Sequence, residues 1–152
     1  MSKKTTPTRR NFLKTSAAVA AAGSIALPHI ANAGKNTGIL KVGLVGCGGR
    51  GTGAASQAMN ADPNVRLVAM GDMFGDRIDN SWKSLKGIGK ERFDVKAQNK
   101  FLGFDAYKKV VDMVDVVILT TPPLFRPQHL EYAVGQQKHV FFEKPVAVDP
   151  TG

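Results

Sequence analysis

The feature that most constrains the fold is a glycine-rich hexapeptide, GCGGRG, at residues 46–51. It follows residues 39–45, a short apolar run with the pattern of a buried strand. The spacing G-x-G-x-x-G between a strand and a helix is typical of a loop that holds a pyrophosphate at the start of the helix. Gly46 allows the tight turn, Gly48 lets the backbone approach the phosphates, and Gly51 permits close packing of helix on strand. The alternative interpretation of these glycines is a plain tight turn.

An acidic residue, Asp72, follows the next apolar run, residues 65–70, and lies 21 residues beyond Gly51. This spacing is expected for a carboxylate that accepts hydrogen bonds from the ribose hydroxyls of a dinucleotide. A carboxylate there would repel a 2′-phosphate, so we expect NAD(H) rather than NADP(H), although Arg77 lies near enough to weaken that preference. The alternative role for Asp72 is the N-cap of the following helix. Arg50 is expected either to contact the phosphates or to point to solvent.

Apolar runs and helical periods alternate along the rest of the chain. We expect helices over residues 50–60, 74–85, 106–113 and 127–137, and further strands near residues 99–102, 114–120 and 139–142. The second of these helices would place Phe74, Ile78, Trp82 and Leu85 on one face. Strands that alternate with helices predict an α/β fold with a doubly wound parallel sheet, the Rossmann fold, in which helices cover both faces of apolar strands.

The net charge of +9 does not indicate nucleic-acid binding, because its distribution is uneven. The first 33 residues hold five basic residues and no acidic one, whereas 16 basic and 12 acidic residues follow them. That remaining surplus is scattered and forms no basic stripe with interleaved aromatic residues, so we expect no nucleic-acid partner. The single cysteine, Cys47, excludes an internal disulfide, and we expect it to fill space in the glycine loop rather than to act as a nucleophile. No metal site is expected.

The first 33 residues have the pattern of an export signal. Residues 8–14, TRRNFLK, resemble the twin-arginine motif, and an alanine-rich stretch, residues 17–27, is shorter than the roughly 20 apolar residues of a membrane-spanning helix. Residues 31–33, ANA, offer the small-x-small pattern of signal-peptidase cleavage, which gives a mature start at Gly34. The alternative is an uncleaved N-terminal anchor or amphipathic helix. Twin-arginine export carries folded proteins, so we expect the export machinery as a partner, a cofactor bound before export, and a periplasmic or extracellular location.

Two further turns follow the later strands of the predicted sheet. Thr121-Pro122 comes after residues 114–120, and Glu143-Lys144-Pro145 comes after residues 139–142. The carboxyl ends of parallel strands line the ligand crevice, so the first turn is expected to border the nicotinamide. A lysine at the second turn can donate a hydrogen bond or a proton to a substrate oxygen, with Glu143 orienting it. The alternative is a solvated Glu-Lys pair before a proline turn.

The order of these motifs resembles the glucose–fructose oxidoreductase/inositol dehydrogenase (Gfo/Idh/MocA) family over roughly residues 41–149. The resemblance implies that Lys144 is the family's active-site lysine, which touches the nicotinamide ribose and the substrate, and that Pro122 lies beneath the nicotinamide. Family members often have T-P-N-x-x-H, whereas Pro123 and Arg126 stand at the asparagine and histidine positions here. Arg126 points to a polar or anionic group on the substrate.

The predicted cofactor-binding residues are Gly46, Gly48, Gly49, Arg50, Gly51, Asp72, Arg77, Thr121, Pro122, Glu143 and Lys144. Lys144 is also the predicted catalytic residue. His129 is not assumed to replace the missing family histidine, and His139 is expected to be packed at the start of the last strand.

The resemblance also implies a second α/β domain that supplies most substrate contacts, the oligomer interface and an acid–base histidine. The chain ends at residues 149–152, where the next helix would begin, so we expect residues 34–152 to be a dinucleotide-binding domain without its substrate domain. We expect no turnover by this chain alone and a homo-oligomer only with the second domain.

Three functions are consistent with the sequence. The first is an exported NAD-dependent oxidoreductase acting on a CH–OH group of a sugar or polyol. The second is an NAD-dependent glycoside hydrolase similar to the N-acetylgalactosaminidases, and the third is a dinucleotide-binding module without catalysis.

Overall fold

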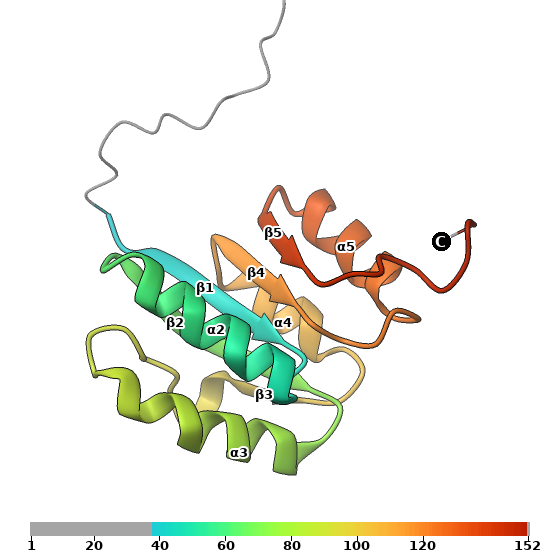
Figure 1. Ribbon diagram of the computed structural model, residues 1–152. Coiled ribbons are helices and arrows are strands. Elements are labelled where there is room, and N and C mark those ends of the chain that lie inside the picture. The colour runs from blue at the N-terminus through green and yellow to red at the C-terminus, as the bar shows by residue number, and fades with distance from the viewer. Residues whose placement is uncertain (1–37, 152) are drawn as a thin grey trace, which may run out of the picture. The chain divides into compact units, whose positions relative to one another are not determined.

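The computed structural model describes residues 38–151, and the predicted leader lies outside them. A five-stranded parallel sheet with the strand order β3-β2-β1-β4-β5 forms the centre of the fold (Figure 1). The strands are β1 (Leu40–Val45), β2 (Val65–Asp72), β3 (Lys100–Leu102), β4 (Val116–Leu119) and β5 (His139–Phe142). The helices are α2 (Gly49–Ala61), α3 (Gly75–Leu85), α4 (Ala106–Asp112) and α5 (Arg126–Gly135), with 3-10 turns at Lys86–Ile88 and Ala97–Asn99. The predicted doubly wound sheet is confirmed, because the strand order reverses direction between β1 and β4.

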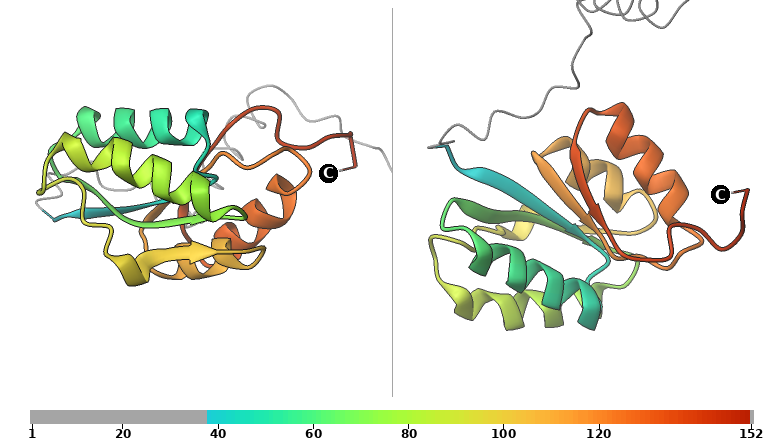
Figure 2. Two further views of the ribbon diagram at one scale, coloured as in Figure 1. Left: turned by 90° about the horizontal axis from the view of Figure 1, so that it is seen from below. Right: turned by 45° about the horizontal axis from the view of Figure 1, so that its top comes forward.

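Helices cover the sheet on both faces, α2 and α3 on one side and α4 and α5 on the other (Figure 2). Successive side chains of β1 therefore enter different cores: Leu44 packs with the α2 and α3 residues, and Val45 packs with the α4 and α5 residues. In β4, Ile118 faces the first core and Leu119 the second. Because both faces of the sheet are covered, the strands need apolar residues at almost every position, which is the pattern that the sequence shows.

One predicted helix face is wrong at its first residue. Phe74 precedes α3 as its N-cap and is 58% exposed, whereas Ile78 and Leu85 are buried as expected and Trp82 is half-buried. The turn that joins β2 to α3 places Phe74 at the carboxyl edge of the sheet and outside the core. His139 also differs from its prediction, because it is exposed at the start of β5.

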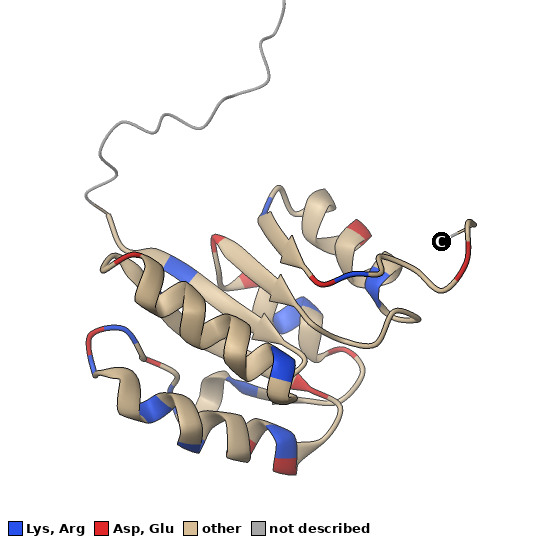
Figure 3. Ribbon diagram, viewed as in Figure 1, with Lys and Arg blue, Asp and Glu red and all other residues tan. Residues whose placement is uncertain are grey.

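Lysine, arginine, aspartate and glutamate are interspersed over the described part of the chain (Figure 3). Within residues 38–151 no helix is both long and apolar enough to cross a membrane. The carboxyl ends of all five parallel strands meet at one edge of the sheet, where the loops after β1, β2, β4 and β5 bring together the motifs of the sequence.

Candidate functional site

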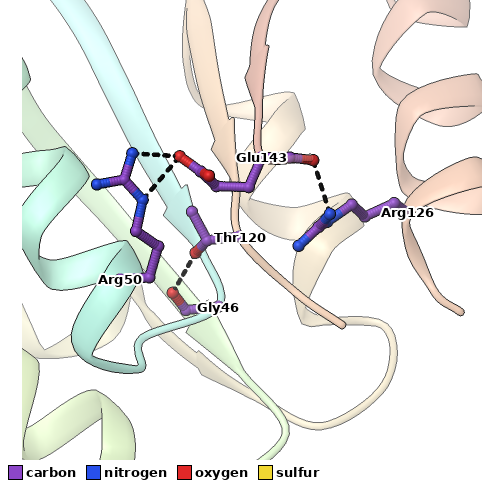
Figure 4. Close-up of polar contacts among 5 residues, drawn as sticks. All are labelled: Gly46, Arg50, Thr120, Arg126 and Glu143. Carbon is purple, nitrogen blue, oxygen red and sulfur yellow. Dashed lines mark hydrogen bonds and ion pairs between the residues drawn. The ribbon is translucent and has the colours of Figure 1, made fainter. Parts of the chain in front are cut away.

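The glycine loop joins β1 to α2 through a turn that side chains would block. Gly46 has a φ of +94°, and a Cβ on it would lie 2.8 Å from the backbone of Thr120. A Cβ on Gly51 would lie only 1.9 Å from the carbonyl oxygen of Gly46. The hydroxyl of Thr120, directly after β4, donates to the Gly46 carbonyl at 2.6 Å (Figure 4). The predicted reasons for glycine at positions 46 and 51 are therefore confirmed.

The start of α2 presents backbone donors at this edge of the sheet. Its N-cap is Gly48, which has no side chain to accept a hydrogen bond from the first turn, and that turn has no acidic residue. The first N–H groups of a helix have no partner within the helix, and the helix dipole adds partial positive charge there. Such a terminus binds anionic oxygens, as a pyrophosphate supplies.

Asp72, the last residue of β2, connects the glycine loop to the turn before α3. One carboxylate oxygen accepts a hydrogen bond from the backbone N–H of Cys47 at 2.6 Å, and the other accepts from the N–H of Phe74 at 2.9 Å. Asp72 is not the N-cap of α3, because that position belongs to Phe74. A carboxylate has about four lone-pair positions, so about two remain for hydroxyl donors of a ligand.

Cys47 is buried within the loop and its thiol lies 3.5 Å from the carbonyl of Gly71. Burial, with the nearby negative charge of Asp72, raises the pKa of the thiol far above its ordinary value. The side chain therefore stays protonated and fills space, as expected.

A cavity of about 540 Å³ opens along the carboxyl edge of the sheet. Six predicted cofactor-binding residues line it, namely Gly46, Gly48, Asp72, Arg77, Thr121 and Pro122. The guanidinium of Arg77 lies beside the glycine loop, with one terminal nitrogen 3.3 Å from the position of a Cβ on Gly48. The other predicted residues, Gly49, Arg50, Gly51, Glu143 and Lys144, are not part of the cavity lining.

Five further lining residues are aromatic, and they were not assigned to the site from the sequence: Phe74, Phe104, Tyr107, Phe125 and His129. Phe104 follows β3 and Phe125 follows the Thr121-Pro122 turn. The rule that carboxyl ends of strands border the ligand would have pointed to these two residues. Their rings are 6.1 Å apart.

His129 is buried beside the turn that follows β4. Its ring stacks on Tyr107 with centroids 4.2 Å apart, and its Nδ1 lies 3.1 Å from the hydroxyl oxygen of Thr121. Burial lowers the pKa of His129 to about 4, so the imidazole is neutral near pH 7. A neutral ring fixed in this way holds Thr121 in place.

The Glu143-Lys144-Pro145 turn is held by two arginines (Figure 4). Arg50, at the start of α2, donates from Nε to the Glu143 carboxylate at 2.8 Å and also forms an ion pair with it. This hydrogen bond lowers the pKa of Glu143. Glu143 was expected to orient Lys144, but its carboxylate binds Arg50, and Lys144 is exposed. The Arg50 side chain remains 57% exposed in this ion pair, and its contact with the phosphates stays a prediction.

Arg126 makes main-chain contacts that the sequence did not predict. It is the first residue of α5, is 7% exposed, and donates from one terminal nitrogen to the carbonyl of Glu143 at 2.6 Å and to the carbonyl of Pro145. Both hydrogens of that nitrogen are thus directed to the main chain. Arg126 also lines the cavity, so its contact with a polar or anionic group of the substrate stays a prediction.

A family model described as an oxidoreductase family with an NAD-binding Rossmann fold, Gfo/Idh/MocA, matches residues 40–152. The chain belongs to this family. A model of the twin-arginine translocation signal matches residues 6–26, so the leader directs the chain to the twin-arginine route and the periplasm. The predicted family, the NAD-binding fold and the export route are therefore confirmed.

Glycosyl hydrolase family 109 protein 1 from Bacteroides thetaiotaomicron is 31% identical over 111 residues, which are 72% of this chain and 23% of that protein. Glucose-6-phosphate 3-dehydrogenase from Bacillus subtilis is 26% identical over 108 residues, which are 71% of this chain and 27% of that protein. The structure of scyllo-inositol dehydrogenase from Lactobacillus casei matches with a TM-score of 0.58 and 25% identity, over 74% of this chain and 30% of that one. The chain thus spans about a quarter of the length of these curated relatives.

Proposed function

We propose that residues 34–152, after cleavage behind Ala33, are the NAD-binding domain of an exported dehydrogenase that acts on a sugar or a polyol. The nicotinamide ring supplies the chemistry of hydride acceptance and donation. The chain's own residues bind the dinucleotide, with the start of α2 at the pyrophosphate and Asp72 at the adenosine ribose. Lys144, at the carboxyl end of β5, holds or transfers a proton at a substrate oxygen.

The observation that carries this proposal is the pair of backbone hydrogen bonds that the Asp72 carboxylate accepts. Backbone donors on both sides orient it at the wall of the cavity while leaving it acceptor positions for ribose hydroxyls. A negative charge there opposes a 2′-phosphate, which supports NAD(H) over NADP(H). We assign Arg77 to the pyrophosphate in this proposal, because its guanidinium lies beside Gly48 in the glycine loop.

Calorimetric titration of the chain with NAD+ and NADP+ tests the cofactor assignment. We expect NAD+ to bind more tightly, and Asp72→Asn to weaken NAD+ binding about tenfold to a hundredfold, because each hydrogen bond to a charged group contributes about 1.5–3 kcal/mol. Asp76→Asn is the matched control, since Asp76 is an exposed acid in the first turn of α3. Tighter binding of NADP+, or binding of neither dinucleotide, would contradict the proposal.

The proposed reaction is tested with a protein that also contains a second domain. We propose that a second domain supplies most substrate contacts and the oligomer interface. We expect oxidation of a sugar or polyol with stoichiometric formation of NADH. The absorbance of the reduced nicotinamide measures this reaction. Lys144→Met should abolish this turnover while NAD+ still binds.

A glycoside hydrolase is the second candidate, because the 31% identical relative is a family 109 glycosyl hydrolase. An enzyme of this kind would release a sugar from a glycoside without net NADH formation. Sugar release at constant nicotinamide absorbance would therefore favour the hydrolase, and net reduction of added NAD+ would favour the dehydrogenase.

A further inference from the structure

Arg126 is the one buried arginine, lysine, aspartate or glutamate among residues 38–151. It is 7% exposed, and its Nε–H is buried without an acceptor among residues 38–151. A buried guanidinium loses its hydration, and each donor left without an acceptor adds to that cost. An apolar residue of similar volume is often at least as stabilising at a buried ion site, so core packing alone does not account for an arginine here.

The contacts that Arg126 does make converge on one residue. Its terminal nitrogen binds the carbonyls of Glu143 and Pro145, which stand immediately before and after Lys144 in the chain. Lys144 has an exposed side chain, so the main chain on either side of it determines the position and direction in which that side chain leaves the backbone. The Glu143 side chain is fixed separately by Arg50 from the start of α2 (Figure 4).

Arginine suits this task for a chemical reason. The guanidinium stays charged when buried, and two hydrogens on one planar nitrogen can point to two carbonyl oxygens at once. A charge-assisted hydrogen bond is stronger than a neutral one, so the two carbonyls are held firmly. The anchor is rigid because Arg126 is part of α5, whose next turn carries the buried and stacked His129.

We infer that Arg126 is a positioning residue that fixes the main chain on both sides of Lys144 and so places the lysine ammonium at the cofactor edge of the sheet. The inference rests on the proposed role of Lys144. Arg126 also lines the cavity, but the inference concerns only the terminal nitrogen that binds the two carbonyls.

Hydrogen exchange followed by mass spectrometry tests the positioning without any cofactor. In Arg126→Gln we expect exchange in residues 143–148 to accelerate at least tenfold at the Glu143 amide, which donates to the carbonyl of Leu119 at 3.1 Å, while exchange in residues 53–61 of α2 stays unchanged. The matched control is Arg92→Gln, because Arg92 also donates to a main-chain carbonyl, that of Met59 at 3.2 Å. The control should leave residues 143–148 unchanged.

Acylation of lysines with and without NAD+ tests the consequence for Lys144. At an NAD+ concentration ten times the dissociation constant, about tenfold slower acylation of Lys144 is expected in the wild type, because only the unbound fraction then reacts. Lys138, which precedes β5 at the opposite end of the strand, serves as the internal reference. Arg126→Gln at equal NAD+ occupancy should lose most of the protection, and Arg126→Lys should restore part of it.

The outcomes distinguish the proposed role of Lys144 from the positioning role of Arg126. Failure of NAD+ to protect Lys144 in the wild type would refute the proposed role of Lys144, whereas the exchange measurement would still judge Arg126. Unchanged exchange in residues 143–148 of Arg126→Gln, or full NAD+ protection of Lys144 in that variant, would overturn the inference. Where Arg126→Gln fails to fold by circular dichroism, Arg126→Lys takes its place in both measurements. Failure of both variants to fold would assign Arg126 to stability alone and refute the positioning role.

Discussion

At the junction between β1 and α2, we expect the same substitution to have opposite effects on stability at two nearby glycines. Alanine should destabilise the fold at Gly51 and stabilise it at Gly53. Gly51→Ala would place a methyl group 1.9 Å from the carbonyl oxygen of Gly46 and 2.5 Å from the hydroxyl oxygen of Thr120. The first neighbour is backbone, so it cannot rotate away, and the end of β1 must separate from α2 by more than an ångström. Gly53→Ala, one half-turn further along α2, meets no atom within 4 Å.

The two free-energy changes follow from these distances. Overpacking against a fixed neighbour typically costs 1–3 kcal/mol, and the backbone contact places Gly51→Ala at about 3 kcal/mol. A domain of this size, between the small and the mid-sized classes, loses roughly 3–6 °C in Tm per kcal/mol, so we expect Tm to fall by roughly 9–18 °C. Gly53→Ala reduces the entropy of the unfolded chain and adds helix propensity, so it should stabilise the fold by about 0.5–1 kcal/mol.

Thermal unfolding followed by circular dichroism at 222 nm, a wavelength that reports helix, measures both changes. Gly51→Ala should also abolish NAD+ binding in calorimetry, because the start of α2 moves away from the turn at Gly46. A Gly51→Ala variant within about 0.5 kcal/mol of the wild type would refute the packing argument, since surface substitutions stay within that range. Equal destabilisation by Gly53→Ala would refute it as well.

Three further predictions concern polar groups near the cavity. Thr120→Val leaves the Gly46 carbonyl without its 2.6 Å donor and should cost about 1–3 kcal/mol in urea unfolding, whereas Thr120→Ser should cost less because it keeps the hydroxyl. Cys47 should resist thiol reagents in the folded chain at pH 8 and react fully in denaturant, because burial raises its pKa; rapid labelling of the folded chain would contradict this. The pKa of His129 is lowered to about 4 in the fold against about 6.5 unfolded, so the unfolded state binds more protons between these values and stability falls as pH falls. This linkage removes on the order of 3 kcal/mol between pH 7 and pH 4, and His129→Asn should show a correspondingly flatter profile in the same range.

The elements of the fold were predictable because each depends on local sequence. The apolar run at residues 114–120 contains β4, and the run at residues 139–142 is β5 without change of boundary. Buried parallel strands require such continuous apolar runs, so the pattern specifies both strand and burial. The glycine spacing also predicted that the start of α2 lies close to the end of β1, since Gly46 and Gly51 are in contact across a single turn.

Contacts between distant segments were not predictable from local pattern. Arg50 and Glu143 are 93 residues apart, and only the folded sheet brings the start of α2 next to the end of β5. The position of Arg126 likewise suggested a substrate contact, because the sequence does not reveal that its guanidinium points back to the main chain. Phe74 fitted the helical period and still lies outside the core, since the turn after β2 takes one more residue than the period implies.

The hydrogen bond between Asp72 and the amide of Cys47 limits how the cofactor preference of this chain can be changed. An arginine or a glycine at position 72 would admit a 2′-phosphate, but it would also release the amide that ties the glycine loop to β2. The loop that we propose to bind the pyrophosphate would then loosen for both dinucleotides alike. Conversion to NADP use therefore requires a neutral acceptor such as serine or asparagine at position 72 together with a cation supplied from a second position. Evolution or design reaches that state through paired substitutions, because the single replacement weakens the grip on either cofactor.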